Sequence, residues 1–497
     1  MLNLECKRAH NEFSVNPILF QSLLVCNIVV PFHKMCYLKT RHVLIYKIIT
    51  IIYYLRVIVQ CDPLTRGIKN DTENLRIQIN QCPPANSAFT FPYPGEYERH
   101  YEQCIAEIAE KRKLVNPDQD LRTPEIILAY NYELVTYDEV VTEDDYILTV
   151  FRIPGGPKSP RAVGKPAVLL HHGLLTASDN WLLQYGDRNL AFKLADAGYD
   201  VWLANARGTD FSQRHNYYNP YRDGGYWQFG FHEIAIYDLP AVIDLMLNET
   251  GNKDIFYVGH SMGATIYTIA LSEIPELNEK IRAGFLLAPA VHIGHAYNPL
   301  RKLTKIVGTP IQDLVYNFLK GHFNGGSNKI LELMGLSPGD VCTPTALRCK
   351  LCENIMFFLY GFNAPQTNYT NLPNVMSKIK NTCSLRTVIH FAQNMISCEF
   401  RKWDYGMAGN LAAYGSFQPP NYDLHGVTAA TYIFYAENDN FIPSVDIETT
   451  RDAMRPETIK GLYKIDFSLF NHLDFVVAVD ADKLVYNKIL ELMQVYL

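Results

Sequence analysis

The pattern of hydrophobic and polar positions over residues 139–153 predicts a β-hairpin. Two runs of strand character, 139–142 and 146–153, are separated by three acidic residues at 143–145. Farther along, short apolar strands alternate with segments of helical periodicity, an order typical of a mostly parallel sheet with helices on both faces. The strands expected after the hairpin cover residues 167–171, 199–204, 254–258, 283–288, 432–436 and 462–467.

Two helices in this series have recognisable ends. Residues 190–197 have helical spacing and stop at Gly198, a residue that suits the end of a helix. A later helix opens at Asp238-Leu239-Pro240, where we expect Asp238 to cap the helix and Pro240 to lie in its first turn.

A long segment of mainly helical periodicity interrupts the strand series. About 140 residues separate strand 283–288 from strand 432–436, too many for a simple loop in a compact α/β domain. An inserted subdomain at this point would cover the carboxyl ends of the strands, where sites form in open sheets. The expected organisation is a targeting region at 1–61, a polar linker or pro-region at 62–120, a first core part at 121–292, a cap insertion at 293–430 and a second core part at 431–497.

The N-terminal region has the pattern of a secretory signal. Apolar stretches cover 17–31 and 43–61, and basic residues precede the second stretch. Its uncharged run, 48–55, is far shorter than the roughly 20 residues of a spanning helix, which favours a signal peptide over an uncleaved signal-anchor. Met35 stands at a conventional distance before this signal, so residues 1–34 form an extension to it.

Composition narrows the class of partner. The 497 residues are 48% hydrophobic and 19% charged, which is a globular balance. A net charge of -6 without a long basic run argues against nucleic acid as a partner. Substrate or small-molecule chemistry is therefore favoured, and no obligate protein partner is evident.

Cysteines and sequons agree with export. Seven of the eleven cysteines follow the targeting region, so at least one of them stays unpaired or bonds elsewhere. The Cys349-x-x-Cys352 spacing lacks a second ligand pair for zinc and favours a structural disulfide. Asn70, Asn248 and Asn368 stand in Asn-x-Ser/Thr sequons and would accept glycans in an exported chain.

The sequence Gly-His-Ser-Met-Gly at 259–263 is the main candidate for chemistry. An apolar strand runs into it and an amphipathic helix runs out, as in a nucleophile elbow that lifts the Ser261 hydroxyl above the sheet edge. A chance match is the alternative, and the flanking strand and helix weigh against it.

A serine nucleophile needs a base, and the base needs an orienting carboxylate. Asp439 and His472 each follow an expected strand, and the order Ser261, Asp439, His472 is that of an α/β-hydrolase. Asp446 and Asp474 compete with Asp439 for the acid role. Asp439 could also be a turn former, and His472 a helix cap or a solvated loop residue.

An oxyanion formed at Ser261 needs two backbone donors. Met262, directly after the nucleophile, supplies one amide, and Leu174, in the loop after strand 167–171, supplies the other. Gly173 lets the backbone approach, although His172-Gly173 alone could be an ordinary turn. His260 is expected to be a packed neighbour of Ser261 and not a second base.

With these motifs in place, the chain resembles the acid lipase family, which includes gastric, lysosomal and many insect lipases of the α/β-hydrolase fold. The matching runs are 137–154 (YDEVVTEDDYILTVFRIP), 170–181 (LHHGLLTASDNW), 196–208 (DAGYDVWLANARG), 237–240 (YDLP), 259–263 (GHSMG) and 470–481 (FNHLDFVVAVDA). They keep a consistent order between residues 120 and 497. The first 120 residues have no counterpart in the family pattern.

The resemblance implies a Ser261–Asp439–His472 triad, oxyanion amides at Leu174 and Met262, and a cap disulfide. The disulfide maps to Cys342 and Cys352, with Cys349 as a competing partner because the spacing is a residue wider than usual. Met262 stands where mammalian relatives often carry glutamine, and YAENDNFIP around Asp439 lacks the usual paired glycines.

We therefore expect a secreted or lysosomal lipase that hydrolyses lipid esters, triacylglycerol or sterol ester, at a lipid–water interface through an acyl-enzyme. No metal, nucleotide or organic cofactor is required. The alternatives are an esterase or acyltransferase acting on soluble esters with the same triad, and a catalytically silent lipid-binding protein on the same scaffold.

Overall fold

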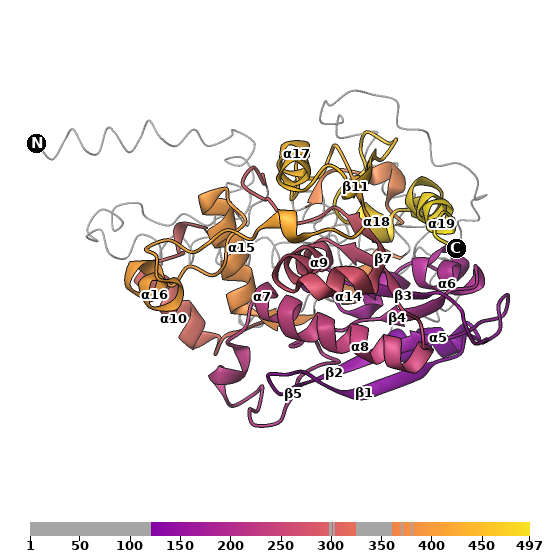
Figure 1. The fold of residues 1–497 in the computed structure, drawn as a ribbon, viewed down its shortest axis with the longest axis horizontal. Helices are drawn as coiled ribbons and strands as arrows, with labels where there is room; N and C mark the ends of the chain where they lie inside the picture. The colour runs from indigo at the N-terminus through magenta and orange to yellow at the C-terminus, as the bar shows by residue number, and fades with distance from the viewer. Residues whose placement is uncertain (1–120, 298–300, 302–303, 325–359, 369–370, 379–380) are drawn as a thin grey trace, which may run out of the picture. The chain divides into compact units, whose positions relative to one another are not determined.

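The computed structural model describes residues 121–497 except 298–300, 302–303, 325–359, 369–370 and 379–380 (Figure 1). Its centre is a sheet in the order β1-β2-β4-β3-β6-β7-β10-β11, with β5 paired to β2. The strands are β1 (Val135–Val141), β2 (Tyr146–Ile153), β3 (Ala167–His171), β4 (Asp200–Leu203), β5 (Arg214–His215), β6 (Ile255–His260), β7 (Ile281–Leu287), β10 (Thr431–Tyr435) and β11 (Ile459–Lys464).

The sheet is antiparallel at its first edge and parallel beyond it. The hairpin β1–β2 and the β2–β4 pair are antiparallel. From β4 through β3, β6, β7 and β10 to β11 every neighbouring pair is parallel. Parallel neighbours require crossover connections, and these bring the helices onto the sheet. The predicted mostly parallel sheet is confirmed; the last strand lies three residues earlier than the expected 462–467.

Two cores lie on the two faces of the sheet. In β3, Ala167 and Leu169 belong to one hydrophobic cluster, and Val168 and Leu170 belong to the other. This alternation of neighbours is the two-residue period of a strand. The central strands are therefore apolar throughout, as is usual when helices cover both faces.

Different helices cover each face (Figure 1). Side chains of α8 (Leu239–Thr250) and α9 (Met262–Glu273) fill the first cluster. The second takes side chains from α5 (Thr123–Ala129), α6 (Leu190–Asp196), α18 (Asp474–Val477) and α19 (Asn487–Gln494). The helix α17 (Ser444–Ala453) follows β10. None of the helices in the described part of the chain is long and apolar enough to cross a membrane.

The expected cap at Asp238 is wrong. The helix begins earlier, at α7 (Phe231–Glu233), and continues through a π-helical turn, Ile234–Asp238, into α8. Asp238 has helical angles, φ -66° and ψ -49°, and its buried carboxylate accepts hydrogen bonds from the Arg207 side chain and amide instead. The π turn precedes Pro240, whose ring and missing amide disturb regular helical bonding.

The segment between β7 and β10 is mainly helical where it is described. Its elements are α10 (Pro310–Phe318), β8 (His322–Asn324), α14 (Leu372–Lys378), β9 (Thr382–Ser384), α15 (Leu385–Ser397) and α16 (Gly406–Tyr414). The strands β8 and β9 form a small antiparallel pair. The targeting region, the linker, Asn70 and the cysteines Cys342, Cys349 and Cys352 lie outside the described residues.

Candidate active site

Ser261 occupies a tight turn between β6 and α9. Its backbone has φ 55° and ψ -113°, a combination that costs of order 1–3 kcal/mol for a non-glycine residue. Two contacts stabilise this turn: the Ser261 amide donates to the Leu287 carbonyl over 2.9 Å, and the Ser261 carbonyl accepts from the Ala264 amide over 3.0 Å. Neighbouring elements therefore hold the strained conformation in place.

The glycines beside Ser261 allow close approach of backbone segments. A Cβ atom on Gly263 would lie 2.3 Å from the His171 carbonyl oxygen of β3. One on Gly259 would lie 2.7 Å from the Gly263 carbonyl carbon. Neither distance is possible for real atoms, so only glycine lets α9 pack this closely against the end of the sheet.

His472 lies between Ser261 and Asp439. Its Nε2 atom is 2.9 Å from Ser261 Oγ, and its Nδ1 atom is 2.8 Å from Asp439 Oδ2. Asp439 is 3% exposed and His472 4% exposed, so both sides of this relay are shielded from water. The structure thus brings together three side chains from the ends of β6, β10 and β11.

Asp439 uses its two oxygens differently. Oδ1 accepts the amides of Phe441 and Ile442, each over 2.8 Å, and this leaves Oδ2 for His472. The two competing acids have other partners. Asp446 pairs with His295 Nδ1 at 2.7 Å, and Asp474 accepts from Asn363 and from the Asn471 amide. Of the three carboxylates, the structure puts Asp439 on the imidazole.

Burial determines the ionisation of the neighbouring groups. His260 lies 3.0 Å from the His472 carbonyl oxygen through its Nε2 atom. Burial, helped by the nearby His472, lowers the pKa of His260 to about 3, so this imidazole stays neutral. Burial also raises the pKa of Asp474 to about 7, with a smaller contribution from the charge of Asp439. The rings of Tyr360 and Phe441 flank His472 at 6.2 and 5.1 Å between centroids.

The expected oxyanion donors lie next to Ser261. Met262 is the first residue of α9, and the first amides of a helix have no partner within the helix. The loop that carries Leu174 follows β3, and a Cβ atom on Gly173 would lie 3.3 Å from Ser261 Cβ. The arrangement offers a nucleophile, a base, an orienting acid and adjacent backbone donors, which is the equipment for acyl transfer from an ester.

Comparisons with known proteins agree with this chemistry. The family model described as the alpha/beta hydrolase fold matches residues 166–310, and that of a partial alpha/beta-hydrolase lipase region matches 123–185. Lipase 3 of Drosophila melanogaster is 37% identical over 359 residues, 72% of this chain and 89% of that protein. The chain belongs to the acid lipase family. The gastric triacylglycerol lipase of Rattus norvegicus is 34% identical over 76% of this chain and 93% of its own length.

The human lysosomal acid lipase/cholesteryl ester hydrolase is also 34% identical, over 78% of this chain and 94% of its own. As a member of the acid lipase family, this chain is a serine ester hydrolase that acts on lipid esters.

Sequence reasoning missed a contact in this acid lipase between the insertion and the loop that carries Asp439. Asn438 Nδ2 donates to the carbonyls of Phe362 and Leu469, each over 2.8 Å. Gly361, with φ 117°, lies so close to Asn438 that a Cβ atom would be 2.2 Å from the Asn438 carbonyl oxygen. Nothing in the local sequence pattern around Asn438 indicates its partner 76 residues earlier.

Two of the expected glycan acceptors of this acid lipase are described. Asn248 is exposed near the end of α8. Asn368 is half-buried, and its Oδ1 atom accepts the Asn371 amide over 3.2 Å. Among the described residues, no group of three or more His, Cys, Asp or Glu side chains could hold a metal ion.

Proposed function

We propose that this acid lipase hydrolyses the long-chain acyl esters of neutral lipids, triacylglycerols and sterol esters, with Ser261 as nucleophile. The observation that carries the proposal is the buried relay from Ser261 Oγ to His472 Nε2 and from His472 Nδ1 to Asp439, at 2.9 and 2.8 Å. The names of the gastric triacylglycerol lipase and the lysosomal acid lipase/cholesteryl ester hydrolase support this substrate class.

The proposed mechanism has two acyl-transfer steps. Ser261 Oγ attacks the ester carbonyl while His472 Nε2 takes the hydroxyl proton, and Asp439 stabilises the resulting imidazolium. The amides of Met262 and Leu174 would bind the oxyanion. His472 then gives the proton to the leaving alcohol, and water repeats the sequence on the acyl-enzyme to release the fatty acid.

Exposed apolar side chains of the insertion support a lipid–water interface as the place of action. On α10, Ile311, Leu314 and Phe318 are 44%, 69% and 61% exposed and follow helical spacing along one face. On α16, Met407 and Leu411 are 69% and 49% exposed. Exposed apolar side chains of this size favour contact with a membrane or lipid surface.

The secretory signal and the sequons support a route through the secretory pathway to the lysosome or the exterior. The gastric and lysosomal relatives agree with this location. N-terminal sequencing of the secreted protein would test it.

The test of the proposal is a substrate profile of the purified protein and of Ser261→Ala. We expect hydrolysis of emulsified trioleoylglycerol and cholesteryl oleate in preference to short soluble esters, and labelling of Ser261 by a fluorophosphonate. Both should be lost in Ser261→Ala and retained in the control Ser272→Ala, which changes a serine near the end of α9, the helix after Ser261; the Ser272 hydroxyl donates to the Asp423 carbonyl. Activity retained in Ser261→Ala would refute the mechanism, and a preference for soluble esters would refute the substrate class.

A further inference from the structure

The loop after β3 is held by hydrogen bonds to two of its carbonyls. The Gly173 carbonyl lies 2.7 Å from His172 Nδ1 and accepts from Thr176 Oγ1 over 2.9 Å. The Leu175 carbonyl accepts the Asn381 amide over 3.0 Å. These carbonyls flank Leu174, whose amide is the expected oxyanion donor.

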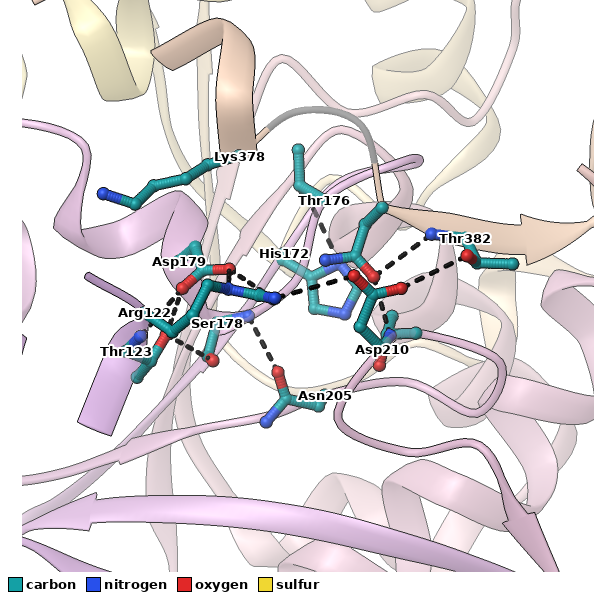
Figure 2. A network of polar contacts seen from close by, with 12 residues as sticks. Arg122, Thr123, His172, Thr176, Ser178, Asp179, Asn205, Asp210, Lys378 and Thr382 are labelled. Atoms are coloured by element: carbon teal, nitrogen blue, oxygen red, sulfur yellow. Dashed lines mark hydrogen bonds and ion pairs between the residues drawn. The ribbon is translucent and has the colours of Figure 1, made fainter. Parts of the chain in front are cut away.

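The tautomer of His172 follows from its partners. The Ala206 amide lies 3.1 Å from His172 Nε2 and can only donate, so Nε2 is the unprotonated nitrogen. Nδ1 therefore carries the proton and donates to the Gly173 carbonyl. His172 is 1% exposed, and burial lowers its pKa to about 4, which keeps the ring neutral above that pH. Figure 2 shows His172 beside Thr176, whose hydroxyl makes only a longer, 3.5 Å contact with Nδ1.

Peptide geometry connects these bonds to Leu174. The peptide between Gly173 and Leu174 is planar and trans, so its carbonyl and its amide point in opposite directions. Two donors on the Gly173 carbonyl therefore fix the direction of the Leu174 amide, which points away from His172 and Thr176. Gly173 itself lies directly against Ser261.

We propose that His172, Thr176 and Asn381 are positioning residues of the oxyanion hole, which together aim the Leu174 amide at the developing oxyanion. The proposal rests on the function proposed above. His172 and Thr176 belong to the core and hold the Gly173 carbonyl, which precedes Leu174 in the chain. Asn381 belongs to the insertion and holds the Leu175 carbonyl, which follows Leu174.

The anchor from the insertion is itself fixed. Asn381 Oδ1 accepts the amide of Asp210 over 2.8 Å. Asp210 Oδ1 accepts the Thr382 hydroxyl over 3.2 Å, and Figure 2 shows these two side chains facing each other. Arg122 pairs with the other Asp210 oxygen at 3.6 Å. Leu175 has φ 60°, a region that non-glycine residues adopt at a cost, and the hydrogen bond from the Asn381 amide to its carbonyl stabilises this conformation. The conformation of the loop after β3 therefore depends on its contact with the insertion.

The main test variant is Thr176→Val, which removes the hydroxyl and keeps the shape of the side chain. Removing an oxyanion donor outright costs about 10²–10³-fold in kcat, and loosening one should cost less, so we expect a loss of about tenfold in kcat at unchanged KM. Thr176→Ser should restore most of the activity. Asn381→Ala, which releases the anchor from Asp210, should lower kcat in the same way.

Inhibition by a boronic acid distinguishes a misplaced oxyanion donor from general damage to the folded protein. A long-chain alkyl boronic acid forms a tetrahedral adduct with the serine and places an oxygen in the oxyanion hole, so its inhibition constant should rise in Thr176→Val by the same factor as kcat falls. The matched control is Thr458→Val, because Thr458 is also buried and its hydroxyl also donates to a loop carbonyl, that of Val427. The control should leave kcat and boronate inhibition unchanged.

Two outcomes would overturn the proposal. One is Thr176→Val with wild-type kcat and wild-type boronate inhibition. The other is a loss that appears in KM or in melting temperature alone and is not restored by Thr176→Ser. Absence of Ser261-dependent activity in the wild-type protein would instead contradict the proposed function, so the two failures are distinguishable.

Discussion

Replacing Asp439 with asparagine should move the proton of His472 to the wrong nitrogen. In the wild-type protein, Asp439 Oδ1 accepts two backbone amides over 2.8 Å. The asparagine oxygen must keep these bonds, because an amide NH₂ group there would face two donors. The NH₂ group then takes the place of Oδ2, 2.8 Å from His472 Nδ1, and donates to it. The imidazole proton therefore resides on Nε2, facing Ser261, and the ring cannot act as a base.

The size of the effect follows from the loss of the base. The same exchange in a Ser-His-Asp triad lowers kcat by about 10⁴-fold, which corresponds to about 5.5 kcal/mol of transition-state stabilisation. Both backbone bonds persist in Asp439→Asn, so we expect little change in its melting temperature. Asp446→Asn is the matched control, since Asp446 is a buried acid paired with a different histidine, His295.

The assay is kcat on a soluble short-chain ester, which removes differences in interface binding, with thermal unfolding measured on the same samples. Asp439→Asn should lose activity and retain its fold, while Asp446→Asn should retain activity. An Asp439→Asn protein that stays within about tenfold of wild-type kcat would refute the assignment of Asp439 as the orienting acid.

Two further predictions concern stability. Burial raises the pKa of Asp474 to about 7, so the folded protein holds a proton that the unfolded chain releases between about pH 4 and pH 7. Asp474 therefore destabilises the fold as the pH rises through this range. The variant Asp474→Asn should be more stable than wild type by up to about 4 kcal/mol at pH 8, and equally stable near pH 4. Urea unfolding at both pH values tests this, and a difference independent of pH would contradict it. Gly263→Ala should cost about 1–3 kcal/mol because its Cβ would meet the His171 carbonyl oxygen of a central strand at 2.3 Å. Thermal unfolding measures this against Gly224→Ala, whose nearest neighbour is at 3.9 Å, and equal melting of the two variants would refute the argument.

Strands and the local context of Ser261 could be predicted from the sequence because they depend on near neighbours. The β3 boundaries, 167–171, follow from a short run of apolar residues that ends at His171, and Asp439 and His472 each follow an expected strand. Adjacent parallel strands end at the same edge of the sheet, so residues that directly follow such strands lie close together in space.

Partners distant in the sequence could not be predicted in this way. Asp238 looked like a helix cap because its local pattern, an acid before a proline-containing first turn, is the same whether or not Arg207 lies against it. The contacts of Asn438 with Phe362 and of Asn381 with Leu175 join the insertion to core loops across long separations. Hydrophobic periodicity carries no information about such pairings.

The spread of the site over three strand ends has a consequence for biosynthesis. His472 follows Ser261 by 211 residues and is supplied by the loop after β11, the last strand of the sheet and one of its edges. A ribosome that adds about 5–20 residues per second needs on the order of 10–40 s to proceed from the nucleophile to its base. During this time the nascent chain carries a serine without a proton acceptor. An enzyme that degrades lipids is therefore synthesised in an inert form, and becomes competent only when its final strand has joined the sheet.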